Sequence, residues 1–275
     1  MFTSHGPSVR ELAAQALTSV ERGYDLLAPK FDHTPFRTPD RMLDAVEETL
    51  AEREGSFGAG LDVCCGTGAA IGMLRRLCRE RVTGVDLSAG MLAEAERVHG
   101  RRPGPDAGPG RDPGQAHASA SPPVDFVRAD ARALPPALGD SYDLAVSFGA
   151  FGHFLPSERP ALFAGVHSAL RAGGLFAFPI GAPIPPASPL WWAVTGFDAA
   201  MRVRNAVWRP PFVMYYRTFP LSGVRSDLQA AGFTVETVPL EHFGRRPVRS
   251  AQAGGRGQSS PRWRLVLARR GPAGG

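Results

Sequence analysis

Residues 61–70 read Leu61-Asp62-Val63-Cys64-Cys65-Gly66-Thr67-Gly68-Ala69-Ala70, and this stretch decides the fold. It combines a short apolar strand, a tight turn of small residues and the start of a helix. Gly66 and Gly68 carry no Cβ that would keep a ligand away from the backbone, and the N–H groups at a helix start point outward. The stretch therefore predicts a nucleotide-type pocket.

The number of residues between this turn and the next feature, an acidic residue, indicates a ligand type. Asp86 ends a second apolar run, residues 81–85, and lies eighteen positions after Gly68 (68 to 86). An acid about 20 residues after a glycine turn suits a ribose with free hydroxyls. Ile71 stands at the third glycine of G-x-G-x-x-G, which disfavours a nicotinamide dinucleotide without excluding it. The spacing alone leaves open which adenosine cofactor binds.

Five motifs over roughly residues 58–180 resemble those of class I S-adenosylmethionine (SAM) dependent methyltransferases, in the family order. They are residues 61–68, residues 84–88 with Met91-Leu92, residues 126–131 with Leu134-Pro135, residues 141–147, and residues 170–176. The resemblance implies an α/β fold: a Rossmann-like doubly wound sheet of seven strands with a C-terminal antiparallel hairpin, N-terminal helices and a cap insertion after strand five. One residue departs from the pattern, because the family usually has glycine where this chain has Cys64. We expect the backbone to be less free there.

The resemblance also implies the residues that hold SAM. Asp62 would reach the amino group of the methionine end, Asp86 the ribose hydroxyls, and Asp130 the adenine amino group. The residues expected to bind the cofactor are Asp62, Cys64, Gly66, Gly68, Asp86, Leu87, Met91, Asp130, Ala131 and Ser147. Two structural alternatives stay open: Asp62 as a hydrogen-bond acceptor at a strand end, and Asp130 as the cap of a turn.

The acceptor side of the site is less defined. His153 follows the fourth strand, whose carboxyl end borders the active site in this fold, so a neutral imidazole there could act as a general base. A packing role at a helix entry is the alternative for His153, and His33 is a second candidate base. Aromatic residues that could contact the substrate are Phe31, Trp191, Trp192 and Tyr215, with Trp208 and Tyr216 beside them. They could equally form a small core of the cap.

The sequence favours a metal-independent methyltransferase that acts on a small molecule, with O, N, C or S as the acceptor atom. No Cys/His cluster has zinc spacing, and the residues after strand four lack the Asn/Asp-Pro-Pro-aromatic motif of amino-methylating DNA enzymes. Three alternatives remain: a catalytically silent SAM-binding protein, a methyltransferase acting on RNA or protein, and a nicotinamide-dependent oxidoreductase.

The composition of the chain limits its domain size, its redox environment and its partners. The 275 residues suffice for one large α/β domain, and the three cysteines are odd in number, which favours reduced thiols and a cytoplasmic location. No apolar run approaches 18 residues, and the first ten residues show no secretory signal pattern, so we expect neither a membrane span nor secretion. The net charge of +5 comes largely from arginines in loops, which argues against a nucleic-acid partner. The oligomeric state is not readable.

The pattern along the chain gives an expected organisation. Residues 1–56 form N-terminal helices, with a helix over 9–24, a break over 24–33 that can act as a lid, and a second helix from Thr38. Residues 57–275 form the SAM-binding domain. Within it, 100–123 and 246–262 are expected to be flexible insertions, 182–219 a substrate cap with a short strand over 213–219, and 233–239 and 263–268 the closing hairpin.

Overall fold

The computed structural model describes residues 7–8, 10–11, 15, 17–34, 36–100, 121–181, 184–208, 213–215, 220–240 and 263–272. Within these ranges the core is a seven-stranded sheet in the order β3-β2-β1-β4-β5-β7-β6. The strands are β1 (Phe57–Val63), β2 (Cys78–Asp86), β3 (Val124–Arg128), β4 (Tyr142–Val146), β5 (Leu170–Gly181), β6 (Phe233–Pro239) and β7 (Trp263–Arg270). This confirms the predicted sheet.

The strand order creates a crevice at the centre of the sheet. From β1 the chain proceeds outward through β2 and β3, then returns to the other side of β1 for β4 and β5. These five strands are parallel, whereas β7 runs antiparallel between β5 and β6 and forms the predicted hairpin. In open sheets of this kind, ligands bind at the carboxyl ends of the strands where the order reverses. Here that point lies between β1 and β4.

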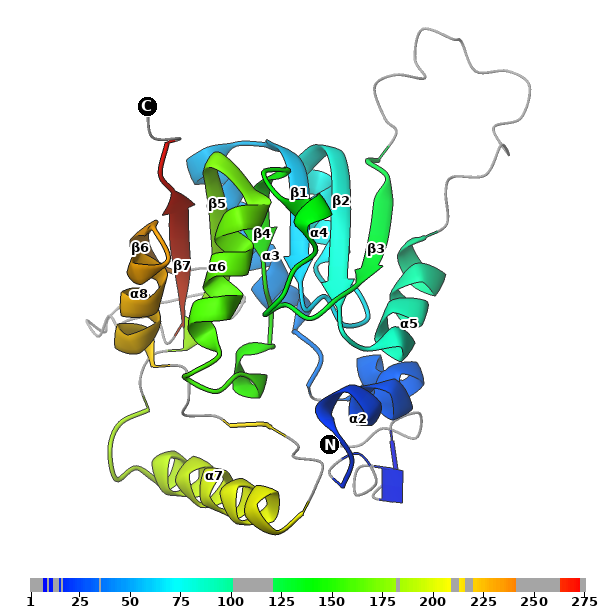
Figure 1. The fold of residues 1–275 in the computed structure, drawn as a ribbon, viewed down its shortest axis with the longest axis vertical. Helices are drawn as coiled ribbons and strands as arrows, with labels where there is room; N and C mark the ends of the chain where they lie inside the picture. Colours follow the sequence, from blue (N-terminus) through cyan, green and yellow to red (C-terminus); the bar gives the residue numbers. More distant parts are fainter. Residues whose placement is uncertain are drawn as a thin grey trace, which may run out of the picture.

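Two helical layers cover the sheet because its strands are apolar on both faces. In β5, Phe176 and Phe178 belong to one core cluster, while Leu175 and Ala177 belong to the other, as the two-residue period of a strand requires. The first cluster packs against α6 (Arg159–Ala169) and α8 (Leu221–Ala230), and the second against α3 (Asp40–Glu54) and α4 (Ile71–Leu77). Figure 1 shows α6 in front of the sheet and α3 behind it.

The N-terminal segment differs from the predicted break. It forms α2 (Val20–Leu27), which continues into the 3-10 helix η1 (Ala28–His33). Ser19 begins α2, since its side chain accepts a hydrogen bond from the N–H of Arg22. Pro29 does not end the helical path, because a proline near a helix start removes an N–H that has no intrahelical partner there. Part of the helix predicted over 9–24 lies outside the described residues.

The predicted cap contains a long helix that the sequence pattern did not indicate. Ser188 caps α7 (Pro189–Val207), with Pro189 at its first position. Figure 1 shows α7 apart from the sheet layers, on the side of the molecule where α2 also lies. Residues 213–215 have no regular structure, so that part of the predicted strand was wrong, and 216–219 lie outside the described residues. The same holds for 101–120 and for 246–262, where the flexible insertions were expected.

Candidate functional site

The turn after β1 takes a backbone conformation that favours glycine. Gly66 and Gly68 have φ of 54° and 86°, and Cys64 has φ of 59°. A Cβ added to Gly66 would meet nothing within 4 Å, so this backbone faces open space. A Cβ on Gly68 would lie 2.7 Å from the ring of His99, so glycine there permits close packing of α5 (Ala89–His99). The left-handed conformation at Cys64 explains why a glycine is the family pattern at that position.

The two cysteines of this turn are suited to packing. Cys65 is buried, and its Sγ lies 3.0 Å from where a Cβ on Gly84 would be. Burial raises the pKa of both the Cys64 and the Cys65 thiol well above the ordinary value, and Asp86 and Asp62 raise the pKa further. Both thiols therefore stay protonated, which makes them poor nucleophiles.

Asp62 stands at the end of β1 with an unusual environment. The residue is 1% exposed, and its Oδ2 accepts no hydrogen bond from the described residues. Burial, and then the negative charge of Asp86, raise the pKa of its carboxyl group well above the ordinary value. A buried carboxylate without partners is costly, so this oxygen is suited to receive a positively charged or hydrogen-bond-donating group.

A second buried polar atom lies across the crevice. Ser147 directly follows β4, which pairs with β1, and its Oγ likewise has no hydrogen-bond partner within the described ranges. Buried polar atoms are satisfied in the great majority of native structures. Two such exceptions, Asp62 and Ser147, at the carboxyl ends of neighbouring central strands therefore indicate a polar ligand between β1 and β4.

Asp86 links the turn after β1 to the turn after β2. One oxygen accepts a hydrogen bond from the N–H of Gly66 at 2.9 Å, and the other accepts from the N–H of Ser88 at 2.9 Å. Burial raises the pKa of Asp86, although the hydrogen bonds from these amides lower it. This structural role was not predicted. Each carboxylate oxygen keeps a second lone pair, so Asp86 can still accept from a ligand hydroxyl.

The two large apolar residues expected to bind the cofactor differ in exposure. Leu87 is at the surface, while Met91 is buried in the first turn of α5. Ser88 caps this helix, because its Oγ accepts from the N–H of Met91 at 3.1 Å. Leu87 is thus available to a ligand, whereas Met91 supports the wall behind it.

Asp130 has a partner that sequence reasoning missed. Arg132 donates to both carboxylate oxygens, at 2.9 Å to Oδ1 and 2.5 Å to Oδ2, and its backbone N–H donates to Oδ1 at 2.9 Å. These contacts lower the pKa of Asp130, and Arg132 also pairs with Glu158. The i, i+2 spacing of an acid and an arginine was the available signal. Ala131 is buried beside this pair.

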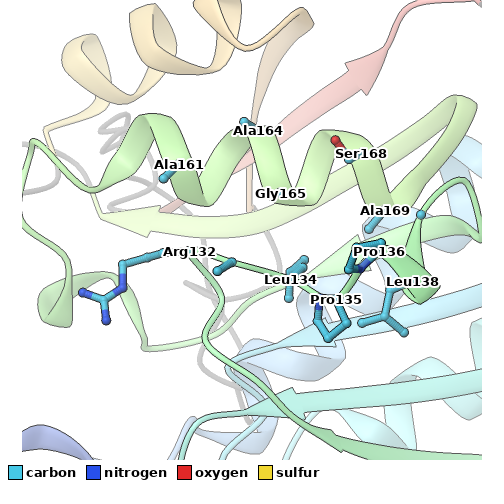
Figure 2. A pocket seen from close by; sticks show the side chains of 12 residues that line it. Arg132, Leu134, Pro135, Pro136, Leu138, Ala161, Ala164, Gly165, Ser168 and Ala169 are labelled. Atoms are coloured by element: carbon cyan, nitrogen blue, oxygen red, sulfur yellow. The ribbon is translucent and has the colours of Figure 1, made fainter.

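Arg132 also borders a second hollow, shown in Figure 2, between α6 and residues 132–139. The cavity has a volume of about 490 Å³ and is lined mostly by small and apolar residues, among them Leu134, Pro135, Ala161 and Gly165. It contains none of the predicted site residues. Because it lacks convergent polar groups, it does not fit a polar cofactor.

The N-terminal segment is joined to both turns of the crevice. Asp32 accepts from the Oγ1 of Thr67 at 2.7 Å. Asp25 accepts from the Oγ of Ser88 at 2.6 Å and from the N–H of Gly90 at 2.9 Å. The helices α2 and η1 therefore lie over the crevice, held by one carboxylate on each turn.

His153 is engaged on both ring nitrogens. Its Nδ1 lies 2.7 Å from the carbonyl oxygen of Val213, which can only accept, so Nδ1 carries the proton. Its Nε2 lies 2.7 Å from the hydroxyl of Tyr24 and accepts from it. Burial lowers the pKa of His153, which keeps the imidazole neutral at pH 7. His33, the second candidate base, is exposed on η1.

The aromatic residues proposed to contact an acceptor separate into two groups. Tyr215 is buried, and its N–H donates to the carbonyl of Gly152 at 2.7 Å, next to His153. The ring of Phe31 packs edge-on against Tyr24, with centroids 5.9 Å apart. Trp191 is half-buried, whereas Trp192 is 61% exposed and packs edge-on against Trp191 with ring centroids 4.7 Å apart. Tyr216 lies outside the described residues.

Metal and membrane features complete the description of these ranges. The described residues contain no group of three or more His, Cys, Asp or Glu side chains placed to hold a metal ion. Among the same residues, no helix is both long and apolar enough to cross a bilayer.

Comparison with known proteins gives a domain match and a fold. A family model described as "Methyltransferase domain" matches residues 61–178. A search of curated proteins returned no match. Among solved structures, the DhpI–SAH complex is similar over 97% of this chain and 100% of that chain, with 19% identity and a TM-score of 0.57.

Two further structures have the same fold. The PH0226 protein from Pyrococcus horikoshii OT3 gives a TM-score of 0.53 at 18% identity, over 87% of this chain and 94% of that chain. A structure described as "Conversion of a Disulfide Bond into a Thioacetal Group during Echinomycin Biosynthesis" gives 0.52 at 18% identity, over 91% and 93%. Together with the sheet order and the paired turns, these findings show a match to a methyltransferase domain over residues 61–178, within a Rossmann-like fold.

Proposed function

We propose that this protein transfers the methyl group of SAM to a small-molecule acceptor by direct displacement, without a metal ion. The observation that carries the proposal is the pair of unsatisfied buried atoms, Asp62 Oδ2 and Ser147 Oγ, beside the open backbone at Gly66. When bound, SAM supplies a methyl group that its sulfonium has already activated. The protein then mainly has to orient the acceptor, and orientation alone can account for roughly 7–11 kcal/mol in model systems.

The residues of the crevice fit the parts of the cofactor. Asp62 would hold the ammonium group of the methionine end, because a positive charge there satisfies its orphaned oxygen. Asp86 would accept from the ribose hydroxyls, and Leu87 would lie against the adenine. Asp130 and the backbone N–H of Ala131 would read the adenine edge, with Arg132 holding the Asp130 carboxylate in place.

A small acceptor is supported by the enclosure of the catalytic side. Tyr24, His153 and Tyr215 are each wholly or partly buried, and they come from α2, from the 3-10 helix η4 (Phe151–His153) and from the segment near α7. A folded macromolecule would not reach a group covered by three elements. DhpI has been solved with SAM and HEP, although its likeness to this chain concerns the fold alone.

We assign proton removal to the Tyr24–His153 pair. The neutral Nε2 of His153 accepts from Tyr24, so a proton leaving an acceptor hydroxyl or amine can pass to the Tyr24 oxygen while the Tyr24 proton passes to Nε2. Because burial places the pKa of His153 below 6.5, we expect turnover to be retained above pH 6.5 and lost as the pH falls below it. We further propose a cytoplasmic location, which suits the three free cysteines.

The test is a methyl-transfer screen with labelled SAM against small-molecule extracts, followed by variants on the acceptor that is found. His153→Ala should lower kcat by about 100-fold with SAM affinity unchanged, and Tyr24→Phe should lower kcat to a similar extent, because His153 receives the proton through the Tyr24 oxygen. The matched control is His167→Ala, because His167 lies on α6 near Gly232, remote from the crevice. SAM binding without transfer to any acceptor would favour a catalytically silent binding protein, and transfer only to RNA or protein would contradict the small-molecule assignment.

A further inference from the structure

Helix α7 contacts the catalytic side through two consecutive residues near its end. Arg204 donates to the side-chain oxygen of Asn205 at 2.8 Å, and this contact identifies the oxygen end of the Asn205 amide because a guanidinium only donates. The Nδ2 group of Asn205 in turn donates to the hydroxyl of Tyr215 at 3.1 Å. Arg204 also reaches the backbone carbonyl of Thr18, just before α2, at 3.5 Å. The end of α7 is therefore bonded both to the start of α2 and to the segment that carries Tyr215.

The segment 213–215 holds His153 through its backbone. The N–H of Tyr215 donates to the carbonyl of Gly152 at 2.7 Å, and the carbonyl of Val213 lies 2.7 Å from the Nδ1 of His153. These two contacts join neighbouring residues of η4 to the two ends of the segment. Residues 213–215 belong to no helix or strand, so their position depends on such contacts. The Tyr215 hydroxyl connects the segment to α7.

The Val213 carbonyl determines which nitrogen of His153 carries the proton. A carbonyl only accepts, so it requires a proton on Nδ1 and leaves the lone pair of Nε2 for the Tyr24 hydroxyl. If this carbonyl moved away, the proton could shift to Nε2, which would then donate to the Tyr24 oxygen and could accept nothing. A base held in the wrong tautomer can lose up to about 10⁴-fold in kcat. The placement of one carbonyl therefore decides whether the Tyr24–His153 pair can take up a proton.

We propose that Asn205 and Tyr215 are positioning residues for His153: the hydrogen bond between them keeps the Val213 carbonyl on Nδ1 and so preserves the tautomer that accepts a proton. The inference rests on the proposed function, since it concerns the base of the same site. Tyr215 then acts through His153 and not by contact with the acceptor, the role that its aromatic ring suggested. Because the two side chains come from α7 and from the segment 213–215, the predicted cap takes part in setting up the base.

The tautomer can be measured without any substrate. Nitrogen-15 NMR of the histidine-labelled full chain reports protonated and unprotonated ring nitrogens separately, and His153→Ala identifies the His153 signals by their absence. The wild type should show a proton on Nδ1 and none on Nε2. Tyr215→Phe keeps the ring and removes the hydroxyl. It should increase the Nε2–H fraction roughly two- to tenfold, the range that one neutral hydrogen bond provides.

Two substitutions of Asn205 separate the hydrogen bond from the packing. Asn205→Leu retains the approximate shape without a donor and should match Tyr215→Phe. Asn205→Asp should keep the wild-type tautomer, because a carboxylate can accept both from the Tyr215 hydroxyl and from Arg204. The double variant Asn205→Leu with Tyr215→Phe should be no worse than either single variant, since both substitutions remove the same hydrogen bond.

The matched control is Tyr142→Phe. Tyr142 is also buried, and its hydroxyl donates to the Oγ1 of Thr83 at 3.0 Å. An arginine guanidinium lies over each ring, 5.3 Å from the Tyr142 centroid and 5.1 Å from the Tyr215 centroid. Tyr142 begins β4, at the end of the strand opposite to the crevice. Loss of its hydroxyl should therefore leave the His153 tautomer unchanged.

Kinetics with an acceptor from the methyl-transfer screen give the second readout. Tyr215→Phe and Asn205→Leu should lower kcat about three- to tenfold and leave the KM for the acceptor unchanged. Three results would overturn the proposal: a wild-type His153 with its proton on Nε2, a tautomer that Tyr215→Phe leaves unchanged, or an equal effect of Tyr142→Phe. A higher KM with an unchanged tautomer would overturn it in favour of an acceptor contact by Tyr215. If the wild type methylates no acceptor, the proposed function fails, whereas the NMR measurement still decides the positioning role.

Discussion

Replacing Asp62 by Asn should stabilise the protein without cofactor and weaken its binding of SAM. The carboxylate is buried, and its Oδ2 has no partner among the described residues, so ionising it is costly. Asn keeps the shape and removes the charge. Replacing the carboxylate by a neutral amide removes the cost of burying a charge, on the order of 1–3 kcal/mol, which should raise Tm by roughly 2–10 °C for a chain of this size.

The gain in stability should depend on pH with a definite sign. The pKa of Asp62 is raised in the folded protein above its ordinary value of 3.8, so the folded state holds a proton that the unfolded state has released. The contribution of the Asp62 carboxyl group to the free energy of unfolding is therefore fully present below pH 3.8. It is lost as the pH rises toward the folded-state pKa. Within that window the advantage of Asp62→Asn should grow by up to about 1.4 kcal/mol per pH unit.

The effect on SAM should be opposite. Loss of a charged hydrogen bond to the ammonium group costs about 1.5–3 kcal/mol, or roughly a 10- to 150-fold increase in Kd. Calorimetric titration with SAM and thermal melts between about pH 5 and pH 8 measure both effects on the same samples. If Asp62→Asn binds SAM as tightly as the wild type, or melts lower at every pH, Asp62 is a structural hydrogen-bond acceptor and the assigned contact is refuted.

Three further changes test other parts of the site. Cys64→Gly should change the free energy of unfolding by less than about 1 kcal/mol. Cys64→Val should lower it by about 2 kcal/mol, because a β-branched residue tolerates the φ of 59° at this position poorly. Chemical denaturation measures both values, and equal stability of the two variants would contradict the prediction. Asp25→Ala removes the carboxylate that accepts from Ser88 and should lower the free energy of unfolding by about 1–2 kcal/mol. Hydrogen exchange of the backbone amides at the start of α5 should become faster. Unchanged protection of these amides would contradict the prediction. Wild type should bind S-adenosylhomocysteine about tenfold tighter than its inosine analogue, and Asp130→Ala should abolish that preference; a preference that persists would assign adenine recognition elsewhere.

The sequence predicts the sheet and the two turns because those signals are local. A strand, two glycines and Asp86 lie within 30 residues, and Ser88 and Gly232 are residue types that mark a helix start and a helix end. The Tyr24–His153 contact joins residues 129 positions apart, so no local pattern reveals it. Helix α7 was missed for a different reason: several of its exposed residues, among them Trp192, Val203 and Val207, are apolar, which obscures the pattern of an amphipathic helix.

The role of Asp86 shows the limit of motif reading in the site itself. The spacing after Gly68 predicts a ribose contact, but not the hydrogen bonds to Gly66 and Ser88 that hold the two turns together. Such contacts depend on the register of β1 against β2, which the sequence of either strand alone does not specify.

A crystal structure of this chain with S-adenosylhomocysteine tests the central claim most directly. We predict the ligand at the carboxyl ends of β1, β2 and β4, with its amino group bonded to Asp62 and its ribose hydroxyls bonded to Asp86. The ligand should occupy the open space at Gly66. A ligand bound elsewhere, or one in the crevice with Asp62 Oδ2 still lacking a partner, would contradict the account.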